Sequence, residues 1–343
     1  MIKPLQSLRG IFAILIFLFH YGQPDGTPIF PYGCDGYVAF FMLLSGYVMS
    51  MAYSARFEDG LSGYGNFIAK RTARIYPLHL LCLLAFLCLS RFDVGIEIIP
   101  NLLLLQSWIP VHKFYFSGNT VSWFLCCLMF FYVLFPMLVR AMREHIKWFY
   151  VFYAIYFIAL AFVPEDMATS LVYVNPAFRI FDFMLGMLLW QYLNRQNSKP
   201  ENSSWLQAVS IVLFIGAYFV FPHVPATVGV ASLWWLPLAV MIAAFRSNGG
   251  VLGKIMSWKP LVLFGDVSFS FYMIHKLAIW FFHILFDHIG ITMDYYAQLA
   301  IILAATIVLS FACYHLFERP VTKWLYGKIQ STPAGAEGGT FRR

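Results

Sequence analysis

The chain has 343 residues, of which 61% are hydrophobic and 11% charged, and its mean hydropathy is +0.72. Because a soluble globular domain carries about 25% charged residues, this composition excludes that class and predicts an all-α polytopic membrane protein. A span needs about 20 apolar residues, so roughly eight to eleven spans fit and no large soluble domain is expected.

The first apolar segment, residues 5–21, carries a cation near one end and an imidazole near the other. Arg9 and His20 are eleven residues apart, which on an α-helix is about 16 Å and three turns, so both side chains project from one face at different depths. A cleaved signal peptide is the alternative interpretation. Because no small-x-small cleavage site follows His20, we expect a retained first span.

Apolar runs separated by polar breaks predict ten spans. A further segment, 96–109, is closed by Pro110 and is too short to cross a membrane, which indicates a re-entrant or interfacial segment. Residues 1–328 are expected to form a single membrane domain, and residues 329–343 a disordered cytoplasmic tail. The predicted spans are residues 5–21, 37–53, 75–91, 121–139, 148–164, 177–194, 205–222, 230–246, 261–283 and 295–317.

The distribution of Lys and Arg orients these spans. With the N-terminus inside, 18 of the 23 Lys and Arg residues fall in cytoplasmic segments, as the positive-inside rule requires. Arg91 and Lys113 fall outside, and Arg9, Arg179 and Lys276 lie within spans. Both termini are therefore expected in the cytoplasm. The same rule accounts for the net charge of +7, so we expect the lipid bilayer, and no nucleic acid, as a partner.

Ionisable side chains inside the predicted spans fall into two layers. Such groups are costly in a bilayer and are commonly functional or paired inside the bundle. The depth of each group follows from its position along the span, at about 1.5 Å per residue. The outer layer comprises His20, Arg179, Asp182 and His275, and the inner layer comprises Arg9, Arg71, Arg74, Asp266 and Glu318.

Each of these groups also has a purely structural interpretation. Arg71 and Arg74, at i and i+3 on one helix face, suit a phosphate-bearing ligand and equally suit anchoring near lipid headgroups. Arg179 and Asp182 fit a structural ion pair. His275 fits an interhelical hydrogen bond.

Several motifs, by their order and membrane placement, resemble those of the family-three membrane acyltransferases, integral membrane enzymes that decorate surface carbohydrates. Arg9 and His20 match that family's spacing of arginine, ten residues and histidine. The resemblance runs from residue 5 to about 320 and is to the membrane-only form, without the periplasmic hydrolase-like domain of some relatives. The other matching motifs are Phe41–Tyr47, in which Met42 and Tyr47 depart from the family pattern, Lys70–Pro77, Ser122–Leu125 with Tyr132 and Pro136, Arg179-x-x-Asp182 with Gly186, Gly265–Ser268 with Tyr272 and His275, and Phe317–Pro320.

This resemblance implies an O-acyltransferase, in many relatives an O-acetyltransferase. Such an enzyme moves an acyl group from cytoplasmic acyl-coenzyme A (acyl-CoA), with acetyl-CoA expected, to a hydroxyl of an extracytoplasmic glycan or lipid-linked sugar. The resemblance further implies a multi-pass protein of a bacterial inner membrane. Acyl-CoA is then a donor substrate, and we expect no permanently bound cofactor and no metal.

His20 is the expected general base, because a sugar hydroxyl is a poor nucleophile and an imidazole titrates near neutrality. An acidic neighbour would fix its tautomer, as in catalytic triads. Asp182 is the candidate for that neighbour because the two side chains have the same predicted depth.

The inner layer is expected to hold the donor. Arg9 is assigned to the catalytic site, where it orders the thioester or binds phosphate. Coenzyme A binding is assigned to Arg71, Arg74, Ser45 and Gly46, and supporting roles are assigned to Trp123, Arg179, His275 and Glu318, the last beside the arginines.

Two questions stay open in the sequence. A polytopic transporter or flippase of a lipid-linked sugar or small solute is the alternative function, although the sequence has no paired broken helices in matching halves. Direct transfer is preferred because no Ser or Cys lies in an evident nucleophile setting beside His20, and an acyl-imidazole on His20 is the alternative.

Trp108 and Trp123 bracket an outer loop in which one of them is a candidate for stacking on a sugar.

Overall fold

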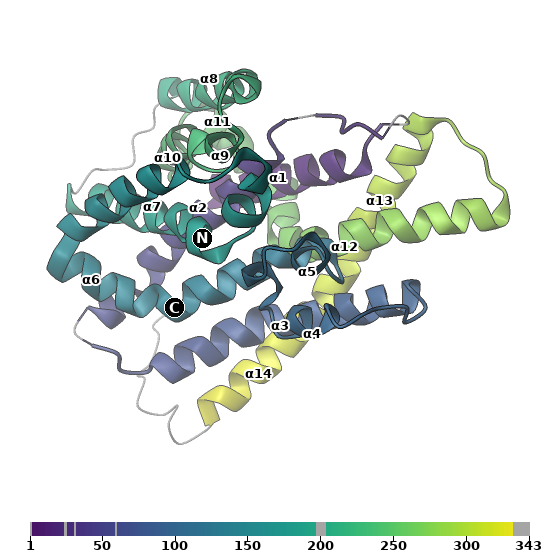
Figure 1. Ribbon diagram of the computed structural model, residues 1–343, viewed down its shortest axis with the longest axis horizontal. Helices are drawn as coiled ribbons and strands as arrows, with labels where there is room; N and C mark the ends of the chain where they lie inside the picture. Colours follow the sequence, from purple (N-terminus) through teal and green to yellow (C-terminus); the bar gives the residue numbers. More distant parts are fainter. Residues whose placement is uncertain (1, 24–25, 31, 59, 197–203, 332–343) are drawn as a thin grey trace.

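The computed structural model of the chain describes residues 2–23, 26–30, 32–58, 60–196 and 204–331, and these residues form helices and no strand. The longer helices are α1 (Lys3–Tyr21), α2 (Cys34–Phe57), α3 (Tyr64–Leu89), α6 (Trp123–Leu160), α7 (Pro176–Arg195), α8 (Ser204–Val220), α10 (Trp235–Ala244), α12 (Lys259–Ile289), α13 (Tyr295–Cys313) and α14 (Arg319–Ser331) (Figure 1). The short α-helices are α4 (Ile98–Leu102), α5 (His112–Tyr115), α9 (Ala226–Gly229) and α11 (Val251–Met256). The 3-10 turns are η1 (Gln106–Trp108), η2 (Thr120–Ser122), η3 (Glu165–Met167), η5 (Phe221–His223) and η6 (Ser232–Trp234), and the π-helical turns are η4 (Ala168–Tyr173) and η7 (Tyr314–Glu318).

The predicted class, an all-α polytopic membrane protein, is confirmed. Each of the ten predicted spans contains a helix, and among the described residues seven helices are long and apolar enough to cross a membrane, or eight if the η4–α7 pair, bent by 61°, is one span. Helix α6 covers two predicted spans, since its 38 residues are interrupted by non-helical dihedral angles at His145. Helix α10 has only 10 residues. The number of ten spans and the cytoplasmic position of the termini therefore stay predictions.

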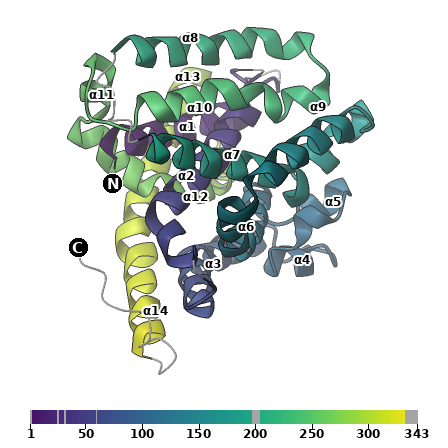
Figure 2. The ribbon, with the colours of Figure 1, turned by 90° about the vertical axis from the view of Figure 1, so that its left-hand side faces the viewer.

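The helices lie in a bundle with two distinguishable ends. Figure 1 shows the start of α3 and the end of α14 at the left and the connection between α12 and α13 at the right. Both views place α8, α10 and α11 on one side of the molecule and α3 with α14 on the other (Figures 1 and 2). Because α14 ends at Ser331, residues 329–331 of the predicted disordered tail are helical, and residues 332–343 lie outside the described residues.

The segment between α3 and α6, predicted to be re-entrant or interfacial, contains short helical turns and no spanning helix. The buried amide of Asn101 holds it together, because its Nδ2 donates to Ser122 Oγ at 3.0 Å. An ion pair joins Lys113 Nζ to Glu97 Oε2 at 3.1 Å. Hydrogen bonds from the backbone N–H of Glu97 itself and from Lys113 hold the pKa of this partly buried carboxyl below its ordinary value.

Helices α2 and α7 approach each other at two glycines. A Cβ placed on Gly46 would clash with the carbonyl oxygen of Phe183, and a Cβ on Gly186 would clash with the carbonyl oxygen of Leu43. Small residues allow membrane helices to approach this closely because no side chain separates their backbones. The α2–α7 contact is thus set by the absence of side chains at these two positions.

Helices α1 and α12 form a second close pair. A Cβ on Gly265 would clash with the carbonyl oxygen of Gln6. One residue further along α12, Asp266 Oδ1 accepts a hydrogen bond of 2.7 Å from Gln6 Nε2. These two contacts fix the register of α1 and α12, and the register decides which of their other polar residues meet.

Replacing Gly46 by Ala is expected to destabilise the protein by about 1–3 kcal/mol, as overpacking of a tight contact does. Thermal unfolding of the purified protein in detergent measures the effect. The matched control is Gly216→Ala on α8, where a Cβ meets no atom of the structure within 4 Å and the higher helix propensity of Ala is worth about 0.5–1 kcal/mol of stabilisation. Equal unfolding temperatures for the two variants would contradict the α2–α7 contact.

Candidate active site

His20 and His275 meet where the last turn of α1 lies against α12. His20 Nδ1 and His275 Nε2 are 3.0 Å apart, and the two ring centroids are separated by 5.0 Å. His275 is fully buried, whereas His20 is half-buried. The edge of the His20 ring contacts Phe19, with centroids 5.4 Å apart. His20 is therefore the member of this pair that a substrate can reach.

The hydrogen-bond partners assign the protons of the histidine pair. His275 Nδ1 lies 2.6 Å from the backbone carbonyl oxygen of Tyr272. A carbonyl oxygen only accepts, so the Nδ1 of His275 carries the hydrogen and, in a neutral ring, its Nε2 is an acceptor. His20 Nδ1–H then donates to His275, which leaves His20 Nε2 with a free lone pair. In this tautomer His20 can accept a proton at Nε2.

The turn of α12 that carries His275 is held by the loop before α6. Tyr272 Oη donates to the carbonyl oxygen of Val121 at 2.9 Å. The buried Asn119 Nδ2 donates to the carbonyl oxygen of Met273 at 2.8 Å. These two bonds tie the loop to the residues directly preceding His275, so the loop restrains the backbone that orients the histidine pair.

A cavity of about 290 Å³ lies between α1, α2, α3, α6 and α12, and we call it the arginine cavity. Arg9, Arg71 and Arg74 all line it, so three predicted donor-binding residues come together in one place. Tyr272, whose carbonyl oxygen orients His275, lines the same cavity. The apolar part of the wall includes Leu44, Val48, Phe124, Leu128 and Phe269.

Two of these arginines have contacts that leave donors available. Arg71 Nη2 donates to Tyr53 Oη at 2.6 Å, and its guanidinium carbon lies 4.9 Å from the Tyr53 ring centroid. The buried Arg71 Nε has no hydrogen-bond partner among the described residues. Arg9 Nη1 donates to Gln6 Oε1 at 3.2 Å. A half-buried guanidinium with an unused N–H suits an anionic ligand that completes its hydrogen bonds.

Glu318 lies beside the third arginine. It forms an ion pair with Arg74 and accepts a hydrogen bond from Ser270. Glu318 is buried at the end of the π-helical turn η7, whereas Arg74 is half-buried. The carboxylate therefore orients Arg74 at the edge of the arginine cavity and has no direct access to the histidine pair through these contacts.

Asp182 does not contact His20. Its Oδ2 lies 2.9 Å from Arg179 Nε, and its Oδ1 accepts a hydrogen bond from Trp235. Both charged residues are at most 1% exposed. The expectation that Asp182 fixes the tautomer of His20 is therefore wrong, since His275 occupies that position. Equal depth in the membrane does not mean that two side chains face each other.

Three other expected site residues lie in three separate places: the cavity wall, a helix contact and the buried interior. Ser45 lines the arginine cavity, with its Oγ 3.5 Å from Tyr132 Oη. Gly46 faces α7, so its assignment to donor binding is corrected to a helix-packing role. Trp123 is only 4% exposed and packs on Tyr173 at a centroid distance of 4.7 Å. Trp123 is thus too buried to stack on a sugar.

The direct contact between His20 and His275 is not predicted from the sequence. One sequence signal points to it, because both side chains belong to the outer layer. Tyr272 and His275 are also i and i+3 on one helix, which allows the carbonyl contact that sets the tautomer. What the sequence lacks is the rotation of α12 about its axis, and only that rotation brings His275 to α1.

The fold and this site define an integral membrane protein with a basic, partly apolar cavity, whose lining residue Tyr272 contacts the inner member of a histidine pair. Residues 3–315 match the model of the acyltransferase domain of acyltransferase family 3. The chain belongs to this family and is a membrane O-acyltransferase. The alternative of a transporter or flippase is set aside on this ground.

The relatives that it matches are bacterial. The chain is 29% identical to the acyltransferase MdmB of Streptomyces mycarofaciens over 316 residues, which is 81% of this chain and 79% of that protein. It is 23% identical over 354 residues to a Staphylococcus aureus strain COL protein provisionally named an O-acetyltransferase, covering 94% of this chain and 57% of that protein. The corresponding protein of strain MSSA476 is 22% identical, with 93% of this chain and 57% of its own length covered. No solved structure matches the chain.

Asp182→Ala is expected to destabilise the protein by about 3–5 kcal/mol, because it leaves the Arg179 guanidinium buried without its counter-charge. The double substitution Arg179→Met with Asp182→Leu removes both charges and is expected to recover most of this loss. Thermal unfolding in detergent gives the comparison. If Asp182→Ala unfolds at the temperature of the unmodified protein, the ion pair contributes nothing and this interpretation fails.

Proposed function

We propose that this protein transfers an acyl group, with acetyl favoured, from cytoplasmic acyl-CoA to a hydroxyl of a glycan or lipid-linked sugar on the other side of the membrane. His20 is the general base of this reaction. The observation that carries the proposal is the histidine pair, joined through Tyr272 to the wall of the cavity that Arg9, Arg71 and Arg74 also line.

The arginine cavity has the chemistry that an acyl-CoA donor requires. Coenzyme A carries phosphates, and arginine guanidinium groups bind phosphate with charge-assisted hydrogen bonds. Its pantetheine arm and acyl group need a less polar path, which Leu44, Val48 and Leu128 supply in the cavity wall. Arg71 and Arg74 thus bind the phosphates, while Arg9 orders the arm.

The length of α1 relates the donor site to the base. Arg9 and His20 lie on one uninterrupted helix, about 16 Å apart along its axis. The thioester therefore enters from the arginine end and the acceptor hydroxyl arrives at His20. In this arrangement the acyl group crosses the membrane inside the protein, whereas coenzyme A stays on the donor side.

The reaction is a direct transfer in which His20 moves one proton. Its Nε2 takes the proton of the acceptor hydroxyl while the hydroxyl oxygen attacks the thioester carbonyl carbon. The carbon–sulfur bond breaks, and the departing thiolate receives the proton from His20, so the products are an ester and free coenzyme A. His275 keeps the Nδ1–H tautomer of His20 throughout, the role that an aspartate has in catalytic triads.

For the acceptor, the proposal names only its chemical class, a sugar hydroxyl. The relatives from Staphylococcus aureus are provisionally named O-acetyltransferases, which supports acetyl as the group and an oxygen as its acceptor. The bacterial relatives support a bacterial cell membrane as the location. Mass spectrometry of surface glycans from cells with and without this protein identifies the acceptor, because the acylated sugar loses one acyl mass when the protein is absent.

His20→Ala is expected to lower the turnover of acyl transfer by about 10²–10⁴-fold, the usual contribution of a general base. His275→Phe keeps a ring of similar size but removes the acceptor for His20 Nδ1–H, and we expect about tenfold or more loss. Turnover is measured with the purified protein, acetyl-CoA and the acceptor identified by mass spectrometry, after the amount of folded protein has been normalised by size-exclusion chromatography.

The matched control for these variants is His283→Phe, on the same helix α12, whose ring lies against Tyr21 at 5.8 Å. It is expected to retain turnover within about twofold, since a contact outside the site contributes little. Full activity in His20→Ala, or equal losses in His275→Phe and His283→Phe, would contradict the roles assigned to the histidine pair.

Replacing Arg71 and Arg74 together by Ala is expected to raise the KM for acyl-CoA tenfold or more, because each hydrogen bond to a charged phosphate is worth about 1.5–3 kcal/mol. The KM for the acceptor is expected to stay unchanged. Initial-rate measurements that vary each substrate separately distinguish the two. Arg140→Gln, which breaks only an exposed ion pair with Glu144, is the control, and an unchanged donor KM in the double variant rejects the assignment.

A further inference from the structure

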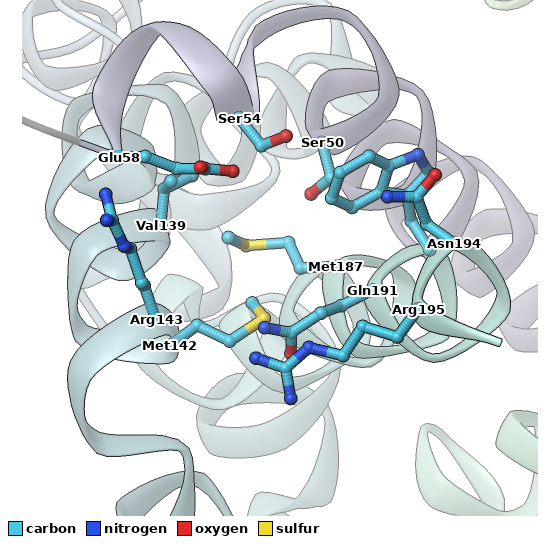
Figure 3. A pocket seen from close by; sticks show the side chains of 11 residues that line it. Ser50, Ser54, Glu58, Val139, Met142, Arg143, Met187, Gln191, Asn194 and Arg195 are labelled. Carbon is cyan, nitrogen blue, oxygen red and sulfur yellow. The ribbon is translucent and has the colours of Figure 1, made fainter. Parts of the chain in front are cut away.

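A second cavity, of about 300 Å³, opens between α2, α6 and α7, and we call it the α2–α6–α7 cavity (Figure 3). Among the described residues it shares no lining residue with the arginine cavity. Its wall is mainly polar, with two arginines, two amide side chains, two serines and one glutamate. Val139, Met142, Met187 and Trp190 complete the wall.

The inner wall of this cavity contains a buried hydroxyl without a partner. Ser50 is 2% exposed, and its Oγ has no hydrogen-bond partner among the described residues. Figure 3 shows this hydroxyl directed into the cavity, with the hydroxyl of Ser54 one helical turn away on the same face. Burying a hydroxyl without a hydrogen-bond partner is unfavourable, because the group loses its hydrogen bond to water. A polar ligand in the cavity would remove this cost.

The charged groups around the hydroxyls favour an anion. Arg143 on α6 and Arg195 at the end of α7 line the cavity, opposed by the single carboxylate of Glu58. Figure 3 shows the Arg195 guanidinium beside the amide of Gln191, on the side of the cavity opposite Ser50 and Ser54. Guanidinium, amide and hydroxyl groups all supply hydrogen-bond donors, and together they match the acceptor oxygens of a phosphate.

The cavity lies at the end of the bundle. Helix α2 ends at Phe57, α7 ends at Arg195, and α6 is interrupted at His145, so all three elements stop or break near its mouth. By the distribution of Lys and Arg this is the predicted cytoplasmic end. Basic pockets between membrane helices at that end bind anionic headgroups.

We propose that the α2–α6–α7 cavity is a binding site for a phosphate compound with a net negative charge. Arg143 and Arg195 pair with the phosphate charge, and Ser50 and Ser54 donate hydrogen bonds to its oxygens. An anionic phospholipid headgroup and a soluble phosphate compound share this chemistry. The site is separate from the arginine cavity, and its occupancy does not depend on His20 or on acyl transfer.

The test uses the full chain, purified in detergent and freed of lipid. Its thermal unfolding is followed during separate titrations with short-chain phosphatidylglycerol, short-chain phosphatidylcholine and inorganic phosphate, because a ligand that binds the folded state raises the unfolding temperature. The variants are Arg143→Gln with Arg195→Gln, and Ser50→Ala. The matched control is Arg140→Gln, an arginine of α6 that pairs with Glu144 and does not line the cavity.

Stabilisation of the unmodified protein by phosphatidylglycerol or by inorganic phosphate is expected, with a half-saturating concentration at least tenfold higher in the double arginine variant and unchanged in Arg140→Gln. Ser50→Ala is expected to weaken binding severalfold, which keeps the test valid if the double variant does not fold. Saturation by phosphatidylglycerol alone identifies a lipid headgroup, and saturation by inorganic phosphate identifies a soluble ligand. The proposal is overturned if neither ligand stabilises the protein, if phosphatidylcholine acts equally, or if the variants bind as the unmodified protein does.

Discussion

The structure depends on the contact between α1 and α12. At one end of this contact Gly265 allows the backbones to approach and Gln6 donates to Asp266, and at the other end His20 donates to His275. Polar groups inside a bilayer must find partners within the protein, because lipid offers none. A bond at each end therefore fixes both the separation and the register of the two helices, and with them the position of the candidate base.

That contact also connects the two halves of the proposed reaction. Arg9 follows Gln6 by one helical turn and lines the arginine cavity, while His20 lies three turns further along the same helix. One rigid element thus spans from the group that orders the donor to the group that activates the acceptor. Rigid placement of reacting groups lowers the entropic part of the barrier, and a helix whose two ends are bonded to α12 provides it.

The remaining buried charges show why an ionisable residue in a span is not by itself a catalytic residue. Arg179 and Asp182 pair with each other, Trp235 donates to the carboxylate, and Arg179 Nη1 donates to the carbonyl oxygen of Val230. The protein tolerates the burial of these two charged side chains only because each supplies the other's counter-charge. His20 differs in being half-buried and in having a lone pair at Nε2 in the assigned tautomer. Access and an unused lone pair, rather than burial, distinguish the candidate base.

The sequence alone determined the membrane class, the helical segments and the family motifs, because hydropathy, helical period and motif spacing are local properties. It also determined that Arg9 and His20 share a face, since both lie on one helix. The sequence further separated the polar residues into layers, because depth is counted along each span. These layers brought Arg9, Arg71 and Arg74 correctly into one region, now seen as the wall of one cavity.

Only the tertiary structure decided which residues of a layer touch. His275 rather than Asp182 contacts His20, and Gly46 faces α7 while its neighbour Ser45 faces the cavity. The physical reason is that contact depends on the rotation of each helix about its own axis and on the choice of neighbouring helix. Both are set by packing between segments far apart in the chain, such as the glycine contacts, and depth along a span contains neither.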